Sequence, residues 1–512
     1  MPDKRGLQSS SMIVYFFVVS LLLTAFNAKM AVAQKVANAP ATTIEDLLHE
    51  MDALKDEVRY LRERDADRQN WESSLAEQPS IAVVPLVSEM SWSFEESNQG
   101  NSSCDTCAGA CCTEQSCRCN GCRCYPCQCP LPEAPCIECS HVSTLTPHYN
   151  INIFGAMVGD MLFNEARPIS PGAPYYLSPA SPTGLDQNTV DVHGRSSYLG
   201  AALTGPQMGN FQAGGMAMVF FYNDNVLADQ YGILPAQVFG DLKNEDWRIA
   251  VGLQFDVFNP GAPTMLAYSA LCGSGNAGNA WRGQFRIERF LNPSKDRQWT
   301  LQAALSEPIA SSITSDFGIL GEDNGWPNIE GRIALGLGPL DAIKAIRPME
   351  IGLSGVVGEI RTTPFAGTRV VTDVWGVAVD YRWQMTERFG VTGEAYTGKT
   401  LGTYNGGILQ NLNATTFDGI NSSGGWGEVF LYWTPCLHSH VGYGIDDPDD
   451  GDLSADPTKA QRERNETFFA NLIWDLNQSF RIGFETTYRE TDNTSVLDNE
   501  GAGFHTQFQW AF

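Results

Sequence analysis

The last residues of the chain alternate strictly between apolar and polar side chains, and this pattern constrains the fold more than any other feature. One side of the segment carries Phe504, Thr506, Phe508, Trp510 and Phe512, and the other carries His505, Gln507 and Gln509. A period of two indicates a β-strand that separates an apolar from a polar environment. Similar segments recur from residue 149 onward. They are long enough for the roughly 9 to 11 residues that a tilted transmembrane strand needs, whereas ordinary strands average about 5 to 6 residues.

Sixteen segments of this kind can be delineated, and their connections alternate in length. They begin near residues 149, 194, 209, 233, 246, 279, 297, 328, 347, 371, 387, 424, 437, 464, 478 and 500. The short turns fall at 205–208, 242–245, 291–295, 384–386, 435–436 and 477, and the long loops at 164–193, 257–278, 308–327, 399–423 and 446–463. An even number of strands closes without an exposed edge, which a bilayer requires.

Tryptophans near the segment ends fit the aromatic girdles of membrane barrels. We therefore predict an all-β fold, a 16-stranded antiparallel transmembrane β-barrel over residues 149–512. The terminal Phe512 resembles the sorting signal of outer-membrane barrels. A soluble all-β assembly is the alternative.

The first 33 residues have the features of an export signal. Lys4 and Arg5 precede an apolar stretch over 12–26, and Ala31 and Ala33 provide a small-residue cleavage site. We predict that residues 1–33 are a signal peptide, with an uncleaved anchor as the alternative.

Residues 42–76 are predicted to form a coiled-coil helix, with Thr42 and Glu45 as a capping box. The heptad positions a and d hold Ile44, Leu47, Met51, Leu54, Val58 and Leu61. Because the other faces of this helix are polar, its apolar stripe needs a partner, which predicts a homo-oligomer. A single amphipathic helix packed on its own domain remains the alternative.

A linker over residues 77–148 contains a cysteine-rich stalk at 104–139. Its cysteines are Cys104, Cys107, Cys111, Cys112, Cys117, Cys119, Cys122, Cys124, Cys127, Cys129, Cys136 and Cys139. In an exported chain such cysteines usually form disulfides, within the chain or between subunits. Pairs spaced this closely could also bind a soft metal ion such as Zn(II) or Cu(I), and redox activity is a third alternative.

Charge and motifs exclude several classes of protein. The chain has 33 basic and 59 acidic residues, a formal net charge of -26. A nucleic-acid binder needs an excess of positive charge to neutralise phosphates, so no nucleic-acid partner is expected. The sequence shows no HExxH or GxSxG pattern. We therefore expect no enzymatic activity and no catalytic residues.

Several short motifs, taken in order, resemble the DcaP-type trimeric outer-membrane porins, a family named for dicarboxylate uptake. They are Arg195-Ser196-Ser197, Leu199-Gly200, the run 250–255, the run 284–290, Glu307-Pro308, the run 424–428, the run 442–447, Arg464-Asn465-Glu466 and Gly483-Phe484-Glu485. The resemblance implies a trimer of sixteen-stranded barrels, each with its own pore, tethered by a periplasmic coiled coil. Where such porins tend to carry inward charges, this chain has Met216, Met218, Ala236 and Gln237.

Alternation along the segments nominates a mixed set of charged residues for the pore lining. They are Arg195, Arg248, Asp256, Arg282, Arg286, Glu288, Arg332, Asp380, Arg382, Glu394, Arg481, Glu485 and Arg489. Opposed charges of this kind would set a transverse field for small polar solutes. Alternatively, they pair across strands and stiffen the wall. The loop over 258–278 could fold into the lumen as a constriction or cap the outer rim.

An acidic run in a long external loop comprises Asp446, Asp447, Asp449, Asp450, Asp452 and Asp456. It is predicted to be a solvated face, with divalent-cation binding at 446–456 as the alternative; otherwise no cofactor is expected. Together these features predict a cell outer-membrane porin, in contact with lipid, for passive diffusion of small polar or anionic solutes. The alternatives are a mainly structural envelope protein cross-linked through its stalk and a metal-binding stalk on a barrel anchor.

Overall fold

The computed structural model describes residues 149–222, 230–292, 296–309, 321–322, 325–340, 346–362 and 369–512. The predicted signal peptide (1–33), coiled coil (42–76) and cysteine-rich linker (77–148) lie outside these residues and stay predictions. Within the described residues, no helix has the length and apolar character needed to cross a membrane.

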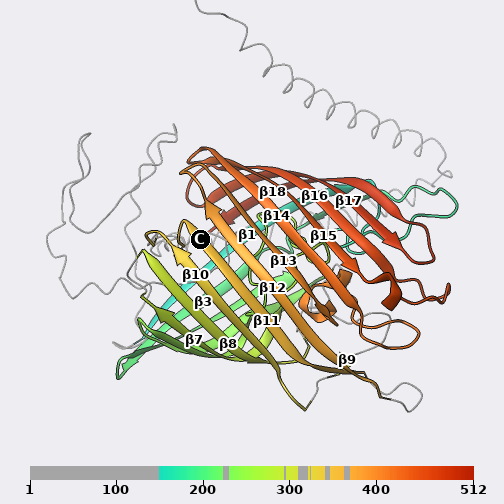
Figure 1. Cartoon of the computed structure of the whole chain (residues 1–512). Coiled ribbons are helices and arrows are strands. Elements are labelled where there is room, and N and C mark those ends of the chain that lie inside the picture. Colours follow the sequence, from blue (N-terminus) through green and yellow to red (C-terminus); the bar gives the residue numbers. More distant parts are fainter. Residues whose placement is uncertain are drawn as a thin grey trace, which may run out of the picture. The chain divides into compact units, whose positions relative to one another are not determined.

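The described chain folds into antiparallel strands joined in one sheet (Figure 1). The strands are β1 (Asn150–Asn164), β2 (Thr189–His193), β3 (Tyr198–Met208), β4 (Phe211–Tyr222), β5 (Tyr231–Lys243), β6 (Trp247–Phe255), β7 (Trp281–Leu291), β8 (Arg297–Ser306), β9 (Gly321–Glu322), β10 (Asn328–Leu337), β11 (Met349–Thr362), β12 (Val371–Gln384), β13 (Phe389–Lys399), β14 (Asn421–Thr434), β15 (Leu437–Pro448), β16 (Arg462–Asp475), β17 (Phe480–Asn493) and β18 (Asn499–Ala511). In the part of the chain that the structure describes, three 3-10 turns lie in the connections: η3 (Gly402–Tyr404), η4 (Gly407–Leu409) and η5 (Asp450–Asp452).

The eighteen labelled strands make sixteen barrel strands, here called staves, because two of the staves are each interrupted. Both β2 and β3 pair with β1, so they are successive halves of the second stave. The two-residue β9 pairs with β11 beyond the end of β10, which makes it an extension of β10. The closed sixteen-stranded antiparallel fold predicted from the sequence is therefore confirmed.

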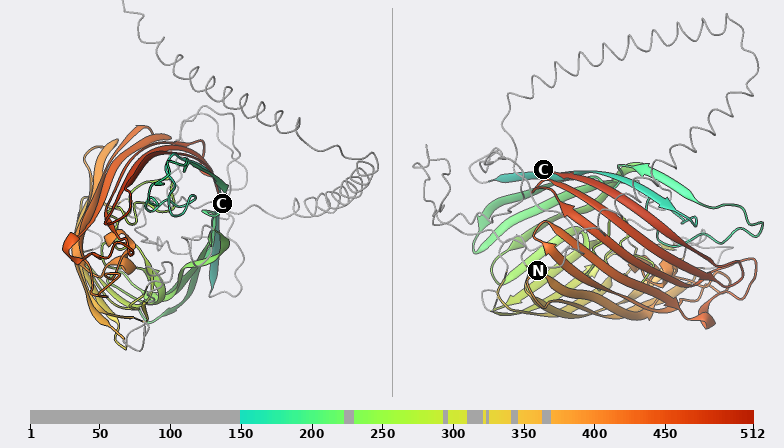
Figure 2. Two further views of the ribbon diagram at one scale, coloured as in Figure 1. Left: turned by 90° about the vertical axis from the view of Figure 1, so that its right-hand side faces the viewer. Right: turned by 90° about the horizontal axis from the view of Figure 1, so that it is seen from above.

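The barrel closes between its first and last strands (Figure 2). Ala156 lies opposite Ala511, and the pairing runs on to Asn164 opposite Gly503. Two backbone hydrogen bonds extend it at the C-terminus: Gly155 N donates to Phe512 O at 3.1 Å, and Phe512 N donates to Gly155 O at 3.0 Å. The C-terminal residue, Phe512, thus takes part in closing the sheet.

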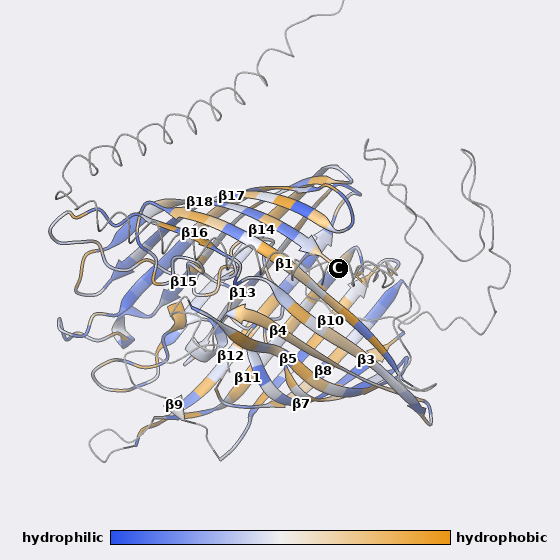
Figure 3. Ribbon diagram, turned by 180° about the vertical axis from the view of Figure 1, so that it is seen from behind, coloured by the Kyte–Doolittle hydropathy of each residue, from blue (hydrophilic) through white to orange (hydrophobic). Residues whose placement is uncertain are grey.

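Hydrophobic and hydrophilic residues follow one another along the strands (Figure 3), and the pleat turns successive side chains to opposite faces of the sheet. In β12, exposed and buried residues alternate for most of the strand. Val377, Val379 and Tyr381 are exposed on the outer face, whereas Ala378 and Asp380 are buried. An outer face of exposed Val, Leu, Phe and Trp side chains suits contact with lipid hydrocarbon.

The connections alternate in length as predicted, with two errors in placement. The long loop predicted at 164–193 ends too late, because Thr189–His193 form β2. The short turn predicted at Gly205–Met208 is wrong, because these residues belong to β3 and the turn lies at 209–210. The β3–β4 pairing is irregular between Thr204 and Gln207, so the alternation is lost locally and the strand end could not be read. The termini of the barrel lie on the rim of the short turns, and the long loops lie on the other rim.

Candidate pore interior

The long loop after β6, residues 256–280 and here called the inner loop, folds against the inner wall of the barrel. Its backbone N–H groups donate to a series of buried glutamates on β10, β13, β14 and β17, here called the carboxylate ladder. The pairs are Val257 N to Glu330 Oε2 at 2.6 Å, Gly261 N to Glu394 Oε1, Thr264 N to Glu428 Oε2 at 2.5 Å and Leu266 N to Glu485 Oε2 at 2.9 Å. The loop therefore folds into the barrel and does not simply cap its outer rim.

Carboxylates suit this task because an ionised carboxylate only accepts hydrogen bonds and has several acceptor sites. Phe258 N also donates to Glu330 at 3.1 Å, and Asn259 N donates to Ser354 Oγ at 3.0 Å. A loop buried in a barrel has no water for its backbone donors, so each of them requires an acceptor from the wall or from another loop segment.

Glycines allow the inner loop to lie directly on the wall. Gly275 has φ of +99°, and a Cβ there would stand 2.1 Å from Gly425 O. A Cβ at Gly444 on β15 would stand 2.1 Å from Ser274 O of the loop. Neither position leaves room for a side chain.

Replacing Gly444 with alanine should therefore push the inner loop off β15. Because the contact is backbone oxygen against a rigid strand, we expect a loss of about 1–3 kcal/mol in the free energy of unfolding, as for overpacking in a core. Urea denaturation of the refolded barrel measures this loss. Gly159→Ala on β1 is the control, because nothing lies within 4 Å of a Cβ there. Equal losses in the two variants would contradict the prediction.

A buried ion pair holds the base of the inner loop. Arg282 Nε donates to Asp256 Oδ1 at 2.8 Å, and both side chains are fully buried. The same guanidinium donates to Glu307 O at 3.1 Å and Pro308 O at 3.0 Å, and lies 3.7 Å from the ring centroid of Tyr404. Burial raises the pKa of the Tyr404 phenol well above its ordinary value. Arg282 thus ties the inner loop to two other loops.

Two more long connections pack on the inner loop. The loop over 400–420 contacts the inner loop through two backbone hydrogen bonds. Tyr404 O accepts from Gly278 N at 2.5 Å, and Asn405 O accepts from Gly273 N at 3.0 Å. The loop over 165–188 meets it through Pro174 O, which accepts from Ser269 Oγ at 2.7 Å. Three loops from one rim therefore converge inside the barrel (Figure 2).

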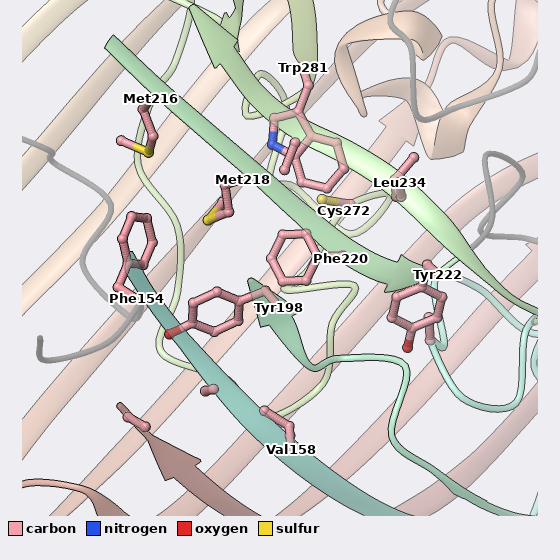
Figure 4. Close-up of a cluster of buried hydrophobic side chains, with 14 of the residues drawn as sticks. Phe154, Val158, Tyr198, Met216, Met218, Phe220, Tyr222, Leu234, Cys272 and Trp281 are labelled. Carbon is pink, nitrogen blue, oxygen red and sulfur yellow. The ribbon is translucent and has the colours of Figure 1, made fainter. Parts of the chain in front are cut away.

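One part of the inner wall is apolar rather than charged (Figure 4). Its members on β1, β3, β4 and β5 are Phe154, Val158, Tyr198, Met216, Met218, Phe220, Tyr222, Leu234 and Ala236. Trp281 stacks on Phe220 with ring centroids 5.7 Å apart, and Tyr268 of the inner loop packs edge-on against Phe220 at 5.4 Å. Burial raises the pKa of the Tyr268 phenol well above its ordinary value. Where the sequence showed methionines in place of charges, the structure therefore has a hydrophobic core shared by strands and loops.

The thirteen residues nominated for the pore lining are all buried or half-buried. Several form ion pairs: Arg195 with Asp191, Arg248 with Asp241 at 2.7 Å and with Glu288 at 3.0 Å, Arg332 with Asp380 at 2.5 Å and with Glu350 at 2.8 Å, and Arg481 with Asp475 at 2.6 Å. Arg286 lies 3.7 Å from Glu288, and Arg489 donates to Thr487 Oγ1 at 2.8 Å. Arg382 lies over the ring of Phe430. Asp256 and Arg282 form the pair at the base of the inner loop, and Glu394 and Glu485 belong to the carboxylate ladder.

Sequence reasoning missed the other two ladder members, Glu330 and Glu428. Glu428 shares the inner face of β14 with two aromatic residues, Trp426 and Phe430. Inward aromatics make the local alternation resemble a lipid-facing row, so the glutamate was not nominated. A glutamate between aromatics at a spacing of two is the signal that could have found it.

The external acidic run is shorter than the sequence suggested. Asp446 and Asp447 belong to β15, and Asp446 is fully buried. Its carboxylate accepts from Tyr396 OH and from Ile408 N at 3.1 Å. Placing Asp446 in the loop was therefore wrong, because alternation turns it inward. Among the described residues, no group of three or more His, Cys, Asp or Glu side chains is arranged to hold a metal ion.

Cys272 should resist thiol reagents while the barrel is folded. It lies in the inner loop, it is not bonded to Cys436, and burial raises the pKa of its thiol to about 12. Because the thiolate is the reactive form, maleimide labelling at neutral pH should be at least tenfold slower than for Cys436, which is half-buried in a turn. Peptide mass mapping before and after unfolding checks this, and equal rates in the folded protein would contradict it.

No family model matches the chain, and no curated protein matches it. Among solved structures, it is similar to the outer-membrane channel DcaP of Acinetobacter baumannii, with 16% identity, a TM-score of 0.56, and coverage of 71% of this chain and 98% of that one. The anion-selective porin from Comamonas acidovorans is similar at 10% identity and a TM-score of 0.45, covering 71% of this chain and 100% of that one. Salmonella typhi OmpF is similar at 12% identity and a TM-score of 0.44, covering 71% of this chain and 98% of that one. The described part of the chain is thus a sixteen-stranded barrel with the fold of the DcaP-type porins, as its sequence motifs predicted.

Proposed function

We propose that this protein is an outer-membrane porin for passive diffusion of small polar or anionic solutes. One observation carries the proposal. The barrel has an apolar exterior, and its inner wall of charged side chains surrounds a loop that folds inward. A barrel with this distribution provides a polar route through lipid, and the inner loop narrows that route. The structural neighbour described as an outer-membrane channel supports the same role.

We further propose that the functional form is a trimer, tethered by the predicted coiled coil over 42–76 on the periplasmic side. The charged residues then act within each barrel. Several arginines of the wall are paired with acids, so selectivity would depend on these local pairs.

Planar-bilayer recording tests the channel role. The purified, heat-modifiable protein should insert with discrete conductance steps in groups of three. Reversal potentials in gradients of salts with a large anion or a large cation then give the charge preference. A folded barrel that never conducts would refute the porin proposal.

The packing of three long loops in the interior favours a second candidate, a mainly structural envelope protein. In that case the barrel anchors the chain and the cysteines at 104–139 cross-link subunits. Envelope-derived protein would then migrate as a higher oligomer on non-reducing gels and as a monomer after reduction. Unchanged mobility would argue against this candidate.

A further inference from the structure

Two histidines on β15 form a hydrogen-bonded chain with carboxylates on the neighbouring strands. His438 Nδ1 lies 2.7 Å from His440 Nε2. At one end His440 Nδ1 lies 2.5 Å from Glu428 Oε1, and at the other His438 Nε2 lies 3.3 Å from Asp475 Oδ2. Both imidazoles are buried. We call Glu428, His440, His438 and Asp475 the histidine relay.

Counting hydrogens shows that the relay needs an extra proton. It has three contacts between nitrogen or oxygen atoms, and each requires one hydrogen to be attractive. Two neutral imidazoles carry one N–H each, which fills two of the three contacts. Without a third hydrogen, one of the three contacts brings two lone pairs together, either at a carboxylate or between the two imidazoles. One imidazolium completes the chain.

The charges around the relay balance when it holds that proton. Arg481 Nε donates to Asp475 Oδ1 at 2.6 Å, so two cations then face the two carboxylates. Two other groups lie nearby. The Tyr432 ring stacks on the His438 ring with their centroids 5.0 Å apart, and Arg382 lies over the ring of Phe430, which is itself next to the His440 ring. Glu485 of β17 reaches the relay only through Asn471.

A second proton cannot be held in the same geometry. Both His438 Nδ1 and His440 Nε2 would then carry hydrogen, and they face each other at 2.7 Å. Two imidazolium ions in contact also repel each other in a buried site. The histidine–histidine contact must therefore open as the second proton binds.

The relay is joined to the inner loop at one residue. Glu428 Oε2, on the same carboxylate that faces His440, accepts from Thr264 N at 2.5 Å. Asn471 Oδ1 accepts from His440 N at 3.1 Å, while Asn471 Nδ2 donates to Thr264 O at 2.7 Å. Both backbone groups of Thr264 thus depend on side chains that also bind His440. Opening of the relay would disturb both.

We propose that the histidine relay is a proton-binding site that docks the inner loop at Thr264 while it holds one proton and releases the loop when it binds a second. This inference rests on the proposed porin function and adds a ligand, the proton, to its interior. Acidification of the solution then loosens the inner loop, because the relay that holds Thr264 lies in the barrel wall.

Bilayer recordings from about pH 8 to about pH 5, where imidazoles titrate, test the proposal. In the wild type, transitions between conductance levels should become roughly tenfold more frequent at the acid end, the effect of losing one hydrogen bond to a charged group. His440→Gln keeps hydrogen-bonding groups but does not titrate, so it should lose the acid response. His505→Gln removes an imidazole beside Asp160, outside the relay, and should keep it.

Glu428→Gln is a second, independent variant. Its amide can still bind Thr264 N and His440, but it lacks the negative charge that favours an imidazolium, so the acid response should move to lower pH. An unchanged response in His440→Gln, or an unshifted one in Glu428→Gln, would overturn the proposal. A wild type that conducts without any acid response overturns this inference alone. A wild type that never conducts overturns the porin function and this inference with it.

Discussion

Replacing Asp256 with alanine should reduce the free energy of unfolding of the barrel by about 3–5 kcal/mol, because it leaves a buried guanidinium without its counter-ion. Arg282 and Asp256 are both fully buried, and Arg282 also joins the inner loop to the loops that follow β8 and β13. The variant therefore loses an ion pair and the alignment of three loops together. Urea unfolding in lipid vesicles, followed by tryptophan fluorescence, measures the change.

An exposed ion pair provides the matched control for this measurement. Arg289 and Asp246 lie 3.0 Å apart near a short turn, with 27% and 54% of their side-chain surfaces exposed. Water screens such a pair, so Asp246→Ala should cost less than about 1 kcal/mol. If Asp256→Ala cost no more than Asp246→Ala, the buried pair would not hold the interior together.

Removing two members of the carboxylate ladder should release the inner loop and change conduction. In Glu394→Ala/Glu485→Ala, Gly261 N and Leu266 N lose their acceptors while they remain buried. Each loss costs about 1.5–3 kcal/mol, so undocking of the loop should become at least roughly a hundredfold more frequent. Single-channel recordings at neutral pH should show a larger and more variable mean conductance than the wild type.

The corresponding glutamine variant separates the hydrogen bond from the charge. Glu394→Gln/Glu485→Gln retains a side-chain oxygen that can accept from each loop N–H, so its mean conductance should stay close to that of the wild type. Both double variants must first show a heat-modifiable folded band. Wild-type conductance in the alanine variant would mean that the ladder does not position the loop.

Most of the barrel could be predicted from the sequence because its information is local. A transmembrane strand reveals itself in its own side chains at positions i and i+2, and the predicted starts of β8, β10, β12 and β15 coincide with those in the structure. The two errors at β2–β3 and at 205–208 lie where a stave is interrupted or its pairing is irregular. At these two places the alternation of apolar and polar residues, which is the local signal for a strand, breaks down.

The interior was harder to predict because alternation gives the direction of a side chain and not its partner. It predicts that Glu394 and Glu485 point inward, but their role in holding the inner loop depends on contacts with Gly261 and Leu266, which are 133 and 219 residues away in the chain. Such pairs form only when the register of the closed barrel brings distant staves and one loop together. Nothing in the local pattern of a strand specifies that register.

The sequence by itself thus determined the number of staves, the lipid-facing rows and the rim of the long loops. These follow from the bilayer, which acts on each strand separately through its length and alternation. Only the tertiary structure decided that charged wall residues pair with each other and with loop backbone, and that His438 and His440 meet Glu428. Buried polar groups must find partners wherever closure places them, so their pairing is a property of the closed barrel and not of any single strand.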